Sequence, residues 1–168
     1  MHFLFNYILL FIALPFFSLF GQQKNIQEPH KPNIIIYLSD DQNAWDFRTF
    51  GNPQVDTSHV DRLIREGMTF SNAYTAQAIC APSRSQLFTG LFPMRNGCMA
   101  NHLPVKNVPD INDYFNAIGY EVILAGKGHI KPSSVFNWTH FYHTAKNRLL
   151  PIDKVRKYIQ NSSKPFCI

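Results

Sequence analysis

The sequence predicts an α/β fold with a mostly parallel central sheet and helices on both of its faces. Two segments, Asn33–Leu38 and Tyr120–Ala125, are nearly continuous runs of aliphatic, β-branched and aromatic residues. Such runs are typical of parallel strands that are buried on both faces. Segments with apolar residues at helical spacing lie between and after these runs, and the alternation of strands with helices favours a parallel sheet.

Four helices and two further extended segments complete the predicted order. Glycine directly follows three of the helices, and proline stands at the start of two. The predicted helices are Thr57–Glu66 (with Thr57 as N-cap), Pro82–Thr89, Ile111–Ile118 and Pro151–Gln160. The predicted extended segments are Met68–Tyr74, as a second strand or extended stretch, and Lys164–Ile168, as a strand that is just beginning.

The N-terminal segment differs from the rest of the chain. Met1–Phe20 contains no Lys, Arg, Asp or Glu and holds six of the fifteen phenylalanines. We predict a secretion signal over residues 1–21, a linker over 22–31 and one domain over 32–168. The alternative is a retained anchor, because the apolar run is close to the roughly 18 residues that begin to span a bilayer. Export places the protein in the periplasm or outside the cell, with only transient contact to the membrane.

Composition and charge narrow the range of functions. Charged residues make up 16% of the chain and apolar residues 45%, which excludes a disordered chain. The net charge of +5 is unchanged when residues 1–21 are removed, so the exported part is itself basic. A basic surface favours polyanionic partners such as sulfated polysaccharide. Because Lys and Arg form no long run, nucleic acid is not expected as a partner.

Two polar clusters follow the two predicted strands, where ligands of α/β sheets collect. Asp40 and Asp41 come directly after the first strand, and adjacent carboxylates favour a hard cation, Ca²⁺ or Mg²⁺, between them. The alternative is a solvated turn. Lys127 and His129 follow the second strand and point to one side if extended, so they could grip an anion and move a proton. The alternative is an ordinary surface pair.

Cys80 stands out among the three cysteines. It lies beside a predicted helix N-terminus and close to Arg84, an environment that lowers the pKa of a thiol or binds an anion. A buried structural role is the alternative. For Cys98 and Cys167 we expect that structural role, or a disulfide between them in an oxidising compartment.

The motif Cys80-Ala81-Pro82-Ser83-Arg84, followed by Leu87-Phe88-Thr89-Gly90, resembles the signature of the type I, formylglycine-dependent sulfatases. Further motifs of this family follow in the expected order between Lys31 and Lys131: Pro32-Asn33-Ile34-Ile35 leading to Asp40-Asp41, Phe70-Ser71-Asn72-Ala73-Tyr74, and Gly119-Tyr120 leading to Gly126-Lys127-Gly128-His129. The resemblance implies an alkaline-phosphatase-like fold, of which residues 32–168 are an incomplete N-terminal part.

The resemblance also implies roles for these residues. Asp40, Asp41 and the modified Cys80 would bind Ca²⁺ or Mg²⁺, and Cys80 would be oxidised to formylglycine. A formylglycine-generating enzyme or an anaerobic sulfatase-maturing enzyme would read the motif Cys80, Pro82, Ser83 and Arg84. Arg84 would then hold the aldehyde hydrate, Lys127 would contact the sulfate, and His129 would shuttle a proton. The substrate would be a sulfated saccharide carrying an O-sulfate or an N-sulfate, and His102 could reach a sugar subsite.

Some family features have no match in the sequence. The remaining metal and sulfate ligands of the family have no counterpart between Ser133 and Ile168, although His140 and His143 are available. We therefore expect these 168 residues alone to hold half a metal site and to be inactive. Two other functions stay open: a metal-dependent phosphatase or phosphodiesterase of the same superfamily, and a non-catalytic fragment that binds anions.

Overall fold

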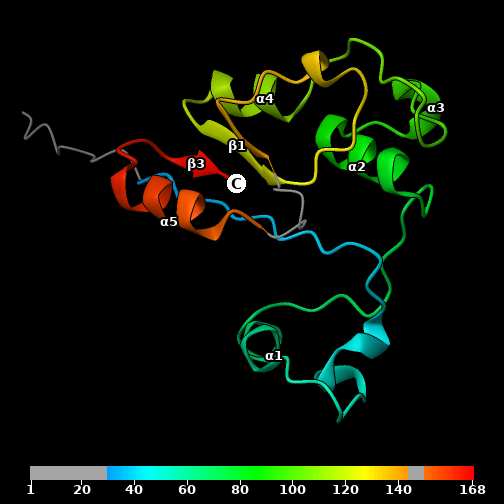
Figure 1. Cartoon of the computed structure of the whole chain (residues 1–168), viewed down its shortest axis with the longest axis vertical. Coiled ribbons are helices and arrows are strands. Elements are labelled where there is room, and N and C mark those ends of the chain that lie inside the picture. Colours follow the sequence, from blue (N-terminus) through cyan, green and yellow to red (C-terminus); the bar gives the residue numbers. More distant parts are fainter. Residues whose placement is uncertain (1–29, 144–149) are drawn as a thin grey trace, which may run out of the picture. The chain divides into compact units, whose positions relative to one another are not determined.

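The central sheet has three parallel strands in the order β2-β1-β3 (Figure 1). The computed structural model describes residues 30–143 and 150–168. In it, β1 (Glu121–Gly126) pairs on one edge with β2 (His140–His143) and on the other with β3 (Phe166–Cys167). Val122 and Ile123 in the middle strand are buried. The predicted parallel α/β sheet is therefore confirmed. The predicted signal, residues 1–21, lies outside the described residues.

The four predicted helices form close to their predicted bounds. They are α1 (Ser58–Glu66), α2 (Cys80–Thr89), α4 (Ile111–Ala117) and α5 (Ile152–Asn161). Helix α2 begins two residues before Pro82, because proline is tolerated within a first turn. A short helix α3 (Pro93–Asn96) and three 3₁₀ turns were not predicted: Ala44–Asp46, Arg48–Phe50 and Ser133–Val135.

A compact apolar cluster fixes α2 against the chain that follows β1. Phe88 of α2 meets the ring of Phe136 edge-on at 5.7 Å and that of Trp138 at 5.2 Å. The rings of Phe136 and Trp138 stack at 5.5 Å. The buried members of this core are Ala81, Phe88, Cys98, Val105 and Phe136. Since Ala81 follows Cys80 directly, this packing holds the start of α2 in place.

The first predicted strand is the main departure from expectation. Asn33–Leu38 was expected to be buried on both faces, yet Ile35 is 66% exposed and Tyr37 78% exposed. The segment joins the sheet only beside β3, where Ile34 N–H donates to the carbonyl of Phe166 at 2.8 Å. Because it has one neighbour, and that neighbour is two residues long, the segment is an edge of the sheet and its faces stay uncovered within the described residues.

Two other strand assignments also differ. Met68–Tyr74 forms no strand, and Met68, Phe70 and Tyr74 are exposed, because no neighbouring strand in the described part pairs with this segment. Strand β2 was not predicted, since its sequence His-Phe-Tyr-His has no aliphatic core residue. Its backbone nevertheless pairs with β1 along its whole length.

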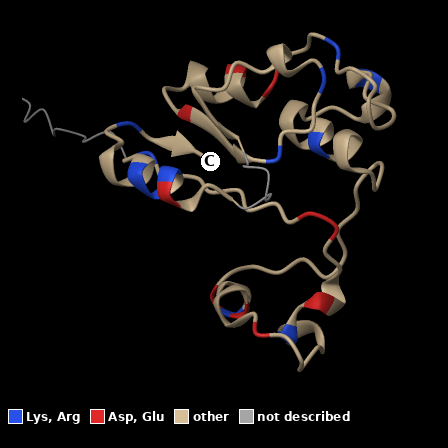
Figure 2. Ribbon diagram, viewed as in Figure 1, with Lys and Arg blue, Asp and Glu red and all other residues tan. Residues whose placement is uncertain are grey.

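The cysteines do not form the disulfide considered above. Cys98 and Cys167 are both buried and free, so the structural alternative is correct and the pairing is wrong. Lys and Arg are spread over several helices and loops (Figure 2). None of the helices in the described residues has both the length and the apolar character that a bilayer-crossing helix needs.

Candidate active site and metal centre

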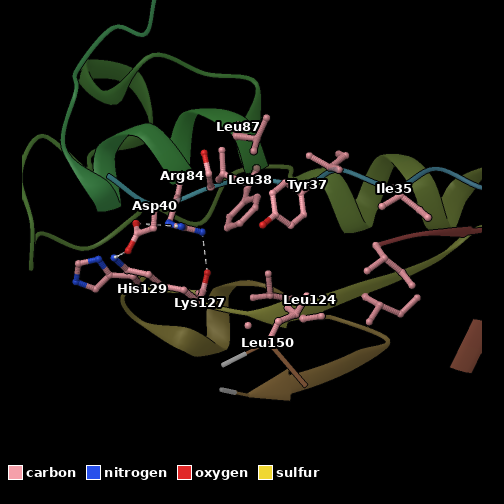
Figure 3. A pocket seen from close by; sticks show the side chains of 18 of the residues that line it. Ile35, Tyr37, Leu38, Asp40, Arg84, Leu87, Leu124, Lys127, His129 and Leu150 are labelled. Carbon is pink, nitrogen blue, oxygen red and sulfur yellow. Dashed lines mark hydrogen bonds and ion pairs between the residues drawn. The ribbon is translucent and has the colours of Figure 1, made fainter. Parts of the chain in front are cut away.

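Asp40 is the centre of a charged cluster that joins three distant parts of the chain. Its carboxylate accepts a hydrogen bond from Lys127 Nζ at 2.7 Å and one from Arg84 Nη2 at 3.3 Å (Figure 3). Arg84 also donates from Nη1 to the backbone carbonyl of Lys127 at 2.9 Å. Arg84 is buried, so its guanidinium rigidly ties helix α2 to the turn that follows β1.

These contacts shift the ionisation of both partners toward their charged forms. The hydrogen bond from Lys127, together with Arg84, holds the pKa of Asp40 below its usual range. Asp40 above all, with a smaller contribution from Cys80, raises the pKa of Lys127. The cluster is therefore a fixed pattern of charges at neutral pH.

Cys80 lies beside the two aspartates. One ligand atom each from Asp40, Asp41 and Cys80 lie within 4.8 Å of one another. A calcium ion binds its oxygens at about 2.3–2.6 Å, so ligands on opposite sides of it are separated by about 5 Å. The spacing of the three atoms fits such an ion. The sulfur of Cys80 marks where an oxygen would lie after oxidation of this side chain, and that oxygen would be a third hard donor beside the two carboxylates.

Asp41 supplies charge that no basic side chain in the described part of the chain balances. Among residues 30–143 and 150–168 it makes no ion pair, whereas Asp40 makes two. Its backbone lies in the left-handed region, with φ of 52°, which costs energy in a residue other than glycine. Both aspartates are exposed, which fits a solvated turn, and one oxygen of each lies close to the Cys80 sulfur, which fits a divalent cation.

Two histidines face each other near the same cluster. The rings of His102 and His129 lie 6.3 Å apart, and both residues have a left-handed backbone, with φ of 74° and 53°. Partial removal of His129 from water lowers its pKa, and the charge of Lys127 lowers it further. The ring of His129 is therefore kept neutral at neutral pH, as a proton acceptor must be.

A cleft of about 1080 Å³ contains this cluster at one end. Asp40, Arg84, Lys127 and His129 form its polar end, and apolar side chains such as Leu124 line the rest (Figure 3). The cleft is thus polar where the charged cluster lies and apolar along the exposed edge segment.

The structure brings together residues that the sequence analysis selected from three separate motifs. Asp40, Asp41, Cys80, Arg84 and Lys127 form one group. Of the maturation motif, Pro82 is buried, and the Ser83 hydroxyl accepts a hydrogen bond from the Thr75 hydroxyl at 3.4 Å.

The sequence analysis gave no structural role to Asn101. Its side-chain carbonyl accepts a hydrogen bond from the backbone N–H of Ala81 at 3.1 Å, next to Cys80. This contact joins residues twenty positions apart, so no local pattern could have indicated it.

Comparison with known proteins gives this geometry a family. The family model described as Sulfatase matches residues 32–166, which include the whole charged cluster. The chain belongs to the sulfatase family. It is 44% identical over 152 residues to an ulvan-active sulfatase of Formosa agariphila, and 33% identical over 116 residues to the human N-acetylgalactosamine-6-sulfatase. These matches cover 87% and 61% of this chain, but only 30% and 22% of the relatives.

Solved structures agree on the fold of this sulfatase chain. A 2-O GAG sulfatase matches with a TM-score of 0.68 and 26% identity, over 83% of this chain and 34% of that one. A protein solved in complex with its substrate D-glucosamine-2-N,6-O-disulfate matches with a TM-score of 0.72 and 24% identity, over 81% of this chain and 33% of the other. The described part therefore has the sulfatase fold and spans about a third of these structures.

Proposed function

We propose that the protein hydrolyses sulfate esters on a saccharide and uses Cys80, after its oxidation to formylglycine, as the nucleophile. The observation that carries the proposal is the group formed by Cys80, the two aspartates and Arg84 at the start of α2. A phosphatase of the same superfamily uses Ser or Thr as its nucleophile, and a cysteine in this motif argues against it.

Oxidation of Cys80 has a chemical reason. A hydrated aldehyde carries two hydroxyls on one carbon, so one can take the sulfuryl group from the ester and the other can expel sulfate as the carbonyl re-forms. A serine at this position could accept the sulfuryl group but would have no internal way to release it. Attack on sulfur breaks the ester S–O bond, and the alcohol of the saccharide leaves with a proton.

The surrounding residues provide what attack on an anion needs. Lys127 and Arg84, which lie together around Asp40, would supply positive charge to the sulfate and so lower the repulsion between two anions. His129, neutral and beside this group, is positioned to hold or pass a proton. Asp40, Asp41 and residue 80 would hold Ca²⁺ or Mg²⁺, which supplies further charge balance when bound. Three ligands are fewer than the roughly six to eight of Ca²⁺, so further donors are needed.

The maturation step would precede folding. Pro82 and Arg84 are buried in the folded chain, so an enzyme that reads these side chains would have to meet the chain before α2 packs. A formylglycine-generating or an anaerobic sulfatase-maturing enzyme would act here. This order also fits the proposed export, in which the chain crosses the membrane by its signal and works in the periplasm or outside the cell.

Names of relatives suggest the first substrates to assay. Ulvan oligosaccharides come first, because the ulvan-active sulfatase shares 44% identity with this chain. N-acetylgalactosamine 6-sulfate and D-glucosamine-2-N,6-O-disulfate provide the comparison. In each case His102, exposed beside His129, is the residue we place against the sugar.

The test is mass and turnover on the whole protein, co-expressed with a maturation enzyme. We expect residue 80 to be lighter by about 18 Da and the protein to release sulfate from one of these sugars but no phosphate from a matching phosphate ester. Cys80→Ala should reduce turnover on the order of 10⁴-fold or more, since the nucleophile is lost. Cys167→Ala, which removes a buried free thiol in β3, away from the group, is the control and should keep turnover. An active protein whose Cys80 is still a thiol would contradict the proposal.

A further inference from the structure

The first turn of helix α2 has an unusual need for a hydrogen-bond acceptor. Residues in a first helical turn have backbone N–H groups without a partner in the helix. Ile79, at the N-cap position, offers no side-chain cap, Pro82 has no N–H, and the N–H of Ser83 already donates to Ile79. Ala81 is 3% exposed, so water does not readily reach it. A buried N–H left without a partner is costly, and that of Ala81 has to find one within the protein.

Asn101 supplies this acceptor from outside the helix. Its side-chain Oδ1 lies 3.1 Å from the backbone nitrogen of Ala81. The contact does the work of an N-cap, although the residue that makes it lies twenty positions later in the chain. Because Ala81 is the neighbour of Cys80, the cap fixes the backbone that carries the nucleophile.

Asn101 belongs to a loop that is also fastened to the opposite side of the site. We call Gly97–Val105 the bridging loop. At its far end, the N–H of Val105 donates to the carbonyl of Lys131 at 2.7 Å, two residues after His129. Near its start, Cys98 is fully buried in the core and its N–H donates to Asn96 Oδ1 at 2.9 Å. The loop is therefore held firmly at both ends.

Between these two attachments the loop brings His102 to His129. The two rings lie 6.3 Å apart, and the left-handed backbone of His102 comes directly after Asn101. A substitution of Asn101 would consequently shift the backbone on both sides of the site, at the start of α2 and at the turn that carries His129.

We propose that Asn101 is a positioning residue, which caps the helix of Cys80 from the bridging loop and so sets the distance between the nucleophile and His129. This inference rests on the proposed sulfatase function, but its structural half, the cap on Ala81, can be tested without any activity.

The experiment compares three variants of the whole protein. Asn101→Leu keeps the size of the side chain and removes the acceptor, whereas Asn101→Asp keeps an oxygen at the same place. Asp56→Ala is the matched control, because the Asp56 carboxylate accepts the N–H of Ser58 at the start of α1, also at 3.1 Å, and takes no part in the site. Each variant is measured for hydrogen exchange at Ala81, for formylglycine content by mass, and for kcat and KM on the sulfated sugar.

Loss of the cap should appear in two separate readings. Asn101→Leu should speed exchange at Ala81 by about fivefold, the effect of losing a helix cap. It should lower kcat per converted enzyme by about tenfold with KM within twofold, because a small displacement of a reacting group is costly. Asn101→Asp should restore most of both values, and Asp56→Ala should leave both unchanged.

Two results would overturn the inference. One is unchanged exchange at Ala81 in Asn101→Leu, and the other is a kcat that falls equally in Asn101→Leu and Asp56→Ala. If the converted wild-type protein releases no sulfate from any sugar, the proposed function fails, while exchange at Ala81 still supports or overturns the cap.

Discussion

At each end of strand β1, a carboxylate is bound to basic or polar side chains. The two groups differ in whether they also contain charged or reactive atoms that have no partner. At the amino end, Glu121 accepts a hydrogen bond from the Tyr158 hydroxyl at 2.5 Å and pairs with Lys164 Nζ at 3.4 Å. At the carboxyl end, Asp40 pairs with Lys127 at 2.7 Å and with Arg84 at 3.3 Å. Each end therefore has a carboxylate paired with a lysine, and Asp40 has a second ion pair, with Arg84.

The amino end is a closed network. Ser162 donates to the Tyr158 oxygen at 3.3 Å, so the hydroxyl has partners on both sides. Burial, together with the hydrogen bond to Glu121, raises the pKa of Tyr158 to about 12, which keeps its proton in place. This group ties α5 to β1 (Figure 1).

The carboxyl end has a charged group and a reactive atom that are not used in its ion pairs. Asp41 makes no ion pair within the described residues, Cys80 lies beside it, and the group opens into a cleft. The comparison teaches that an ion pair alone does not indicate chemistry. A chemical role is indicated when ligand atoms without a partner are held next to a fixed set of charges.

Among the charged residues at the two ends of β1, the largest effect is expected from removing the lysine at the carboxyl end. Lys127→Met should lower kcat/KM on a sulfated sugar by about a hundredfold, because one of the positive groups that we propose to face the sulfate is lost. Sulfate release by the converted protein measures this effect. The same substitution at the amino end, Lys164→Met, is the control and should change kcat/KM by less than about twofold, since an exposed ion pair contributes little. An equal loss of kcat/KM in the two variants would contradict the functional difference that we infer between the two ends of β1.

The sequence predicted the residues of the carboxyl-end group better than it predicted the strand that leads to it. Asn33–Leu38 and Tyr120–Ala125 have the same kind of apolar run, but only the second is buried. An apolar run of this kind indicates that both faces of a segment can be buried. Whether they are buried depends on other segments of the chain, which the run itself does not reveal. Cys80 and the aspartates, in contrast, were identified by residue type and order, which do not depend on packing.

Contacts between residues far apart in the sequence could not be predicted from such local patterns. The ion pair of Lys127 with Asp40 joins positions 87 residues apart, and nothing near either residue indicates the other. Asn101 was missed as a cap for the same reason, because helix caps are ordinarily sought within the first turn. Strand β2 was missed because its pairing with β1, and not its own composition, makes it a strand.

A smaller effect is expected from neutralising the unpaired aspartate. Asp41→Asn keeps the shape of the side chain and removes one negative charge, so calcium affinity of the whole protein should fall by at least about tenfold. Titration calorimetry with Ca²⁺ measures this change. Glu121→Gln removes the same charge at the amino end and should leave the affinity unchanged. If Asp41→Asn binds Ca²⁺ as tightly as the unaltered protein does, Asp41 is not a calcium ligand, and its negative charge does not serve to bind the ion.

The smallest effect tests the closed network at the amino end. The hydrogen bond from Tyr158 lowers the pKa of Glu121, so its ionised form stabilises the folded protein above the unfolded pKa, and this contribution is lost as the pH falls through the folded pKa. Tyr158→Phe removes the bond and should lower the free energy of unfolding by about 1 kcal/mol near neutral pH.

The pH dependence of this loss distinguishes the bond from simple packing. Without the hydroxyl, the pKa of Glu121 moves back toward its ordinary range, so the variant has less stability to lose on acidification. The gap between Tyr158→Phe and the unaltered protein in urea unfolding should therefore stay constant above about pH 5 and narrow as the pH falls from about 5 to about 3. Tyr142→Phe is the control, because the Tyr142 hydroxyl makes no hydrogen bond in the part of the chain described and its removal should cost little at either pH. A gap that stays constant across this range would show that Tyr158 acts through its ring alone, and that the amino end of β1 is held by packing and not by its charges.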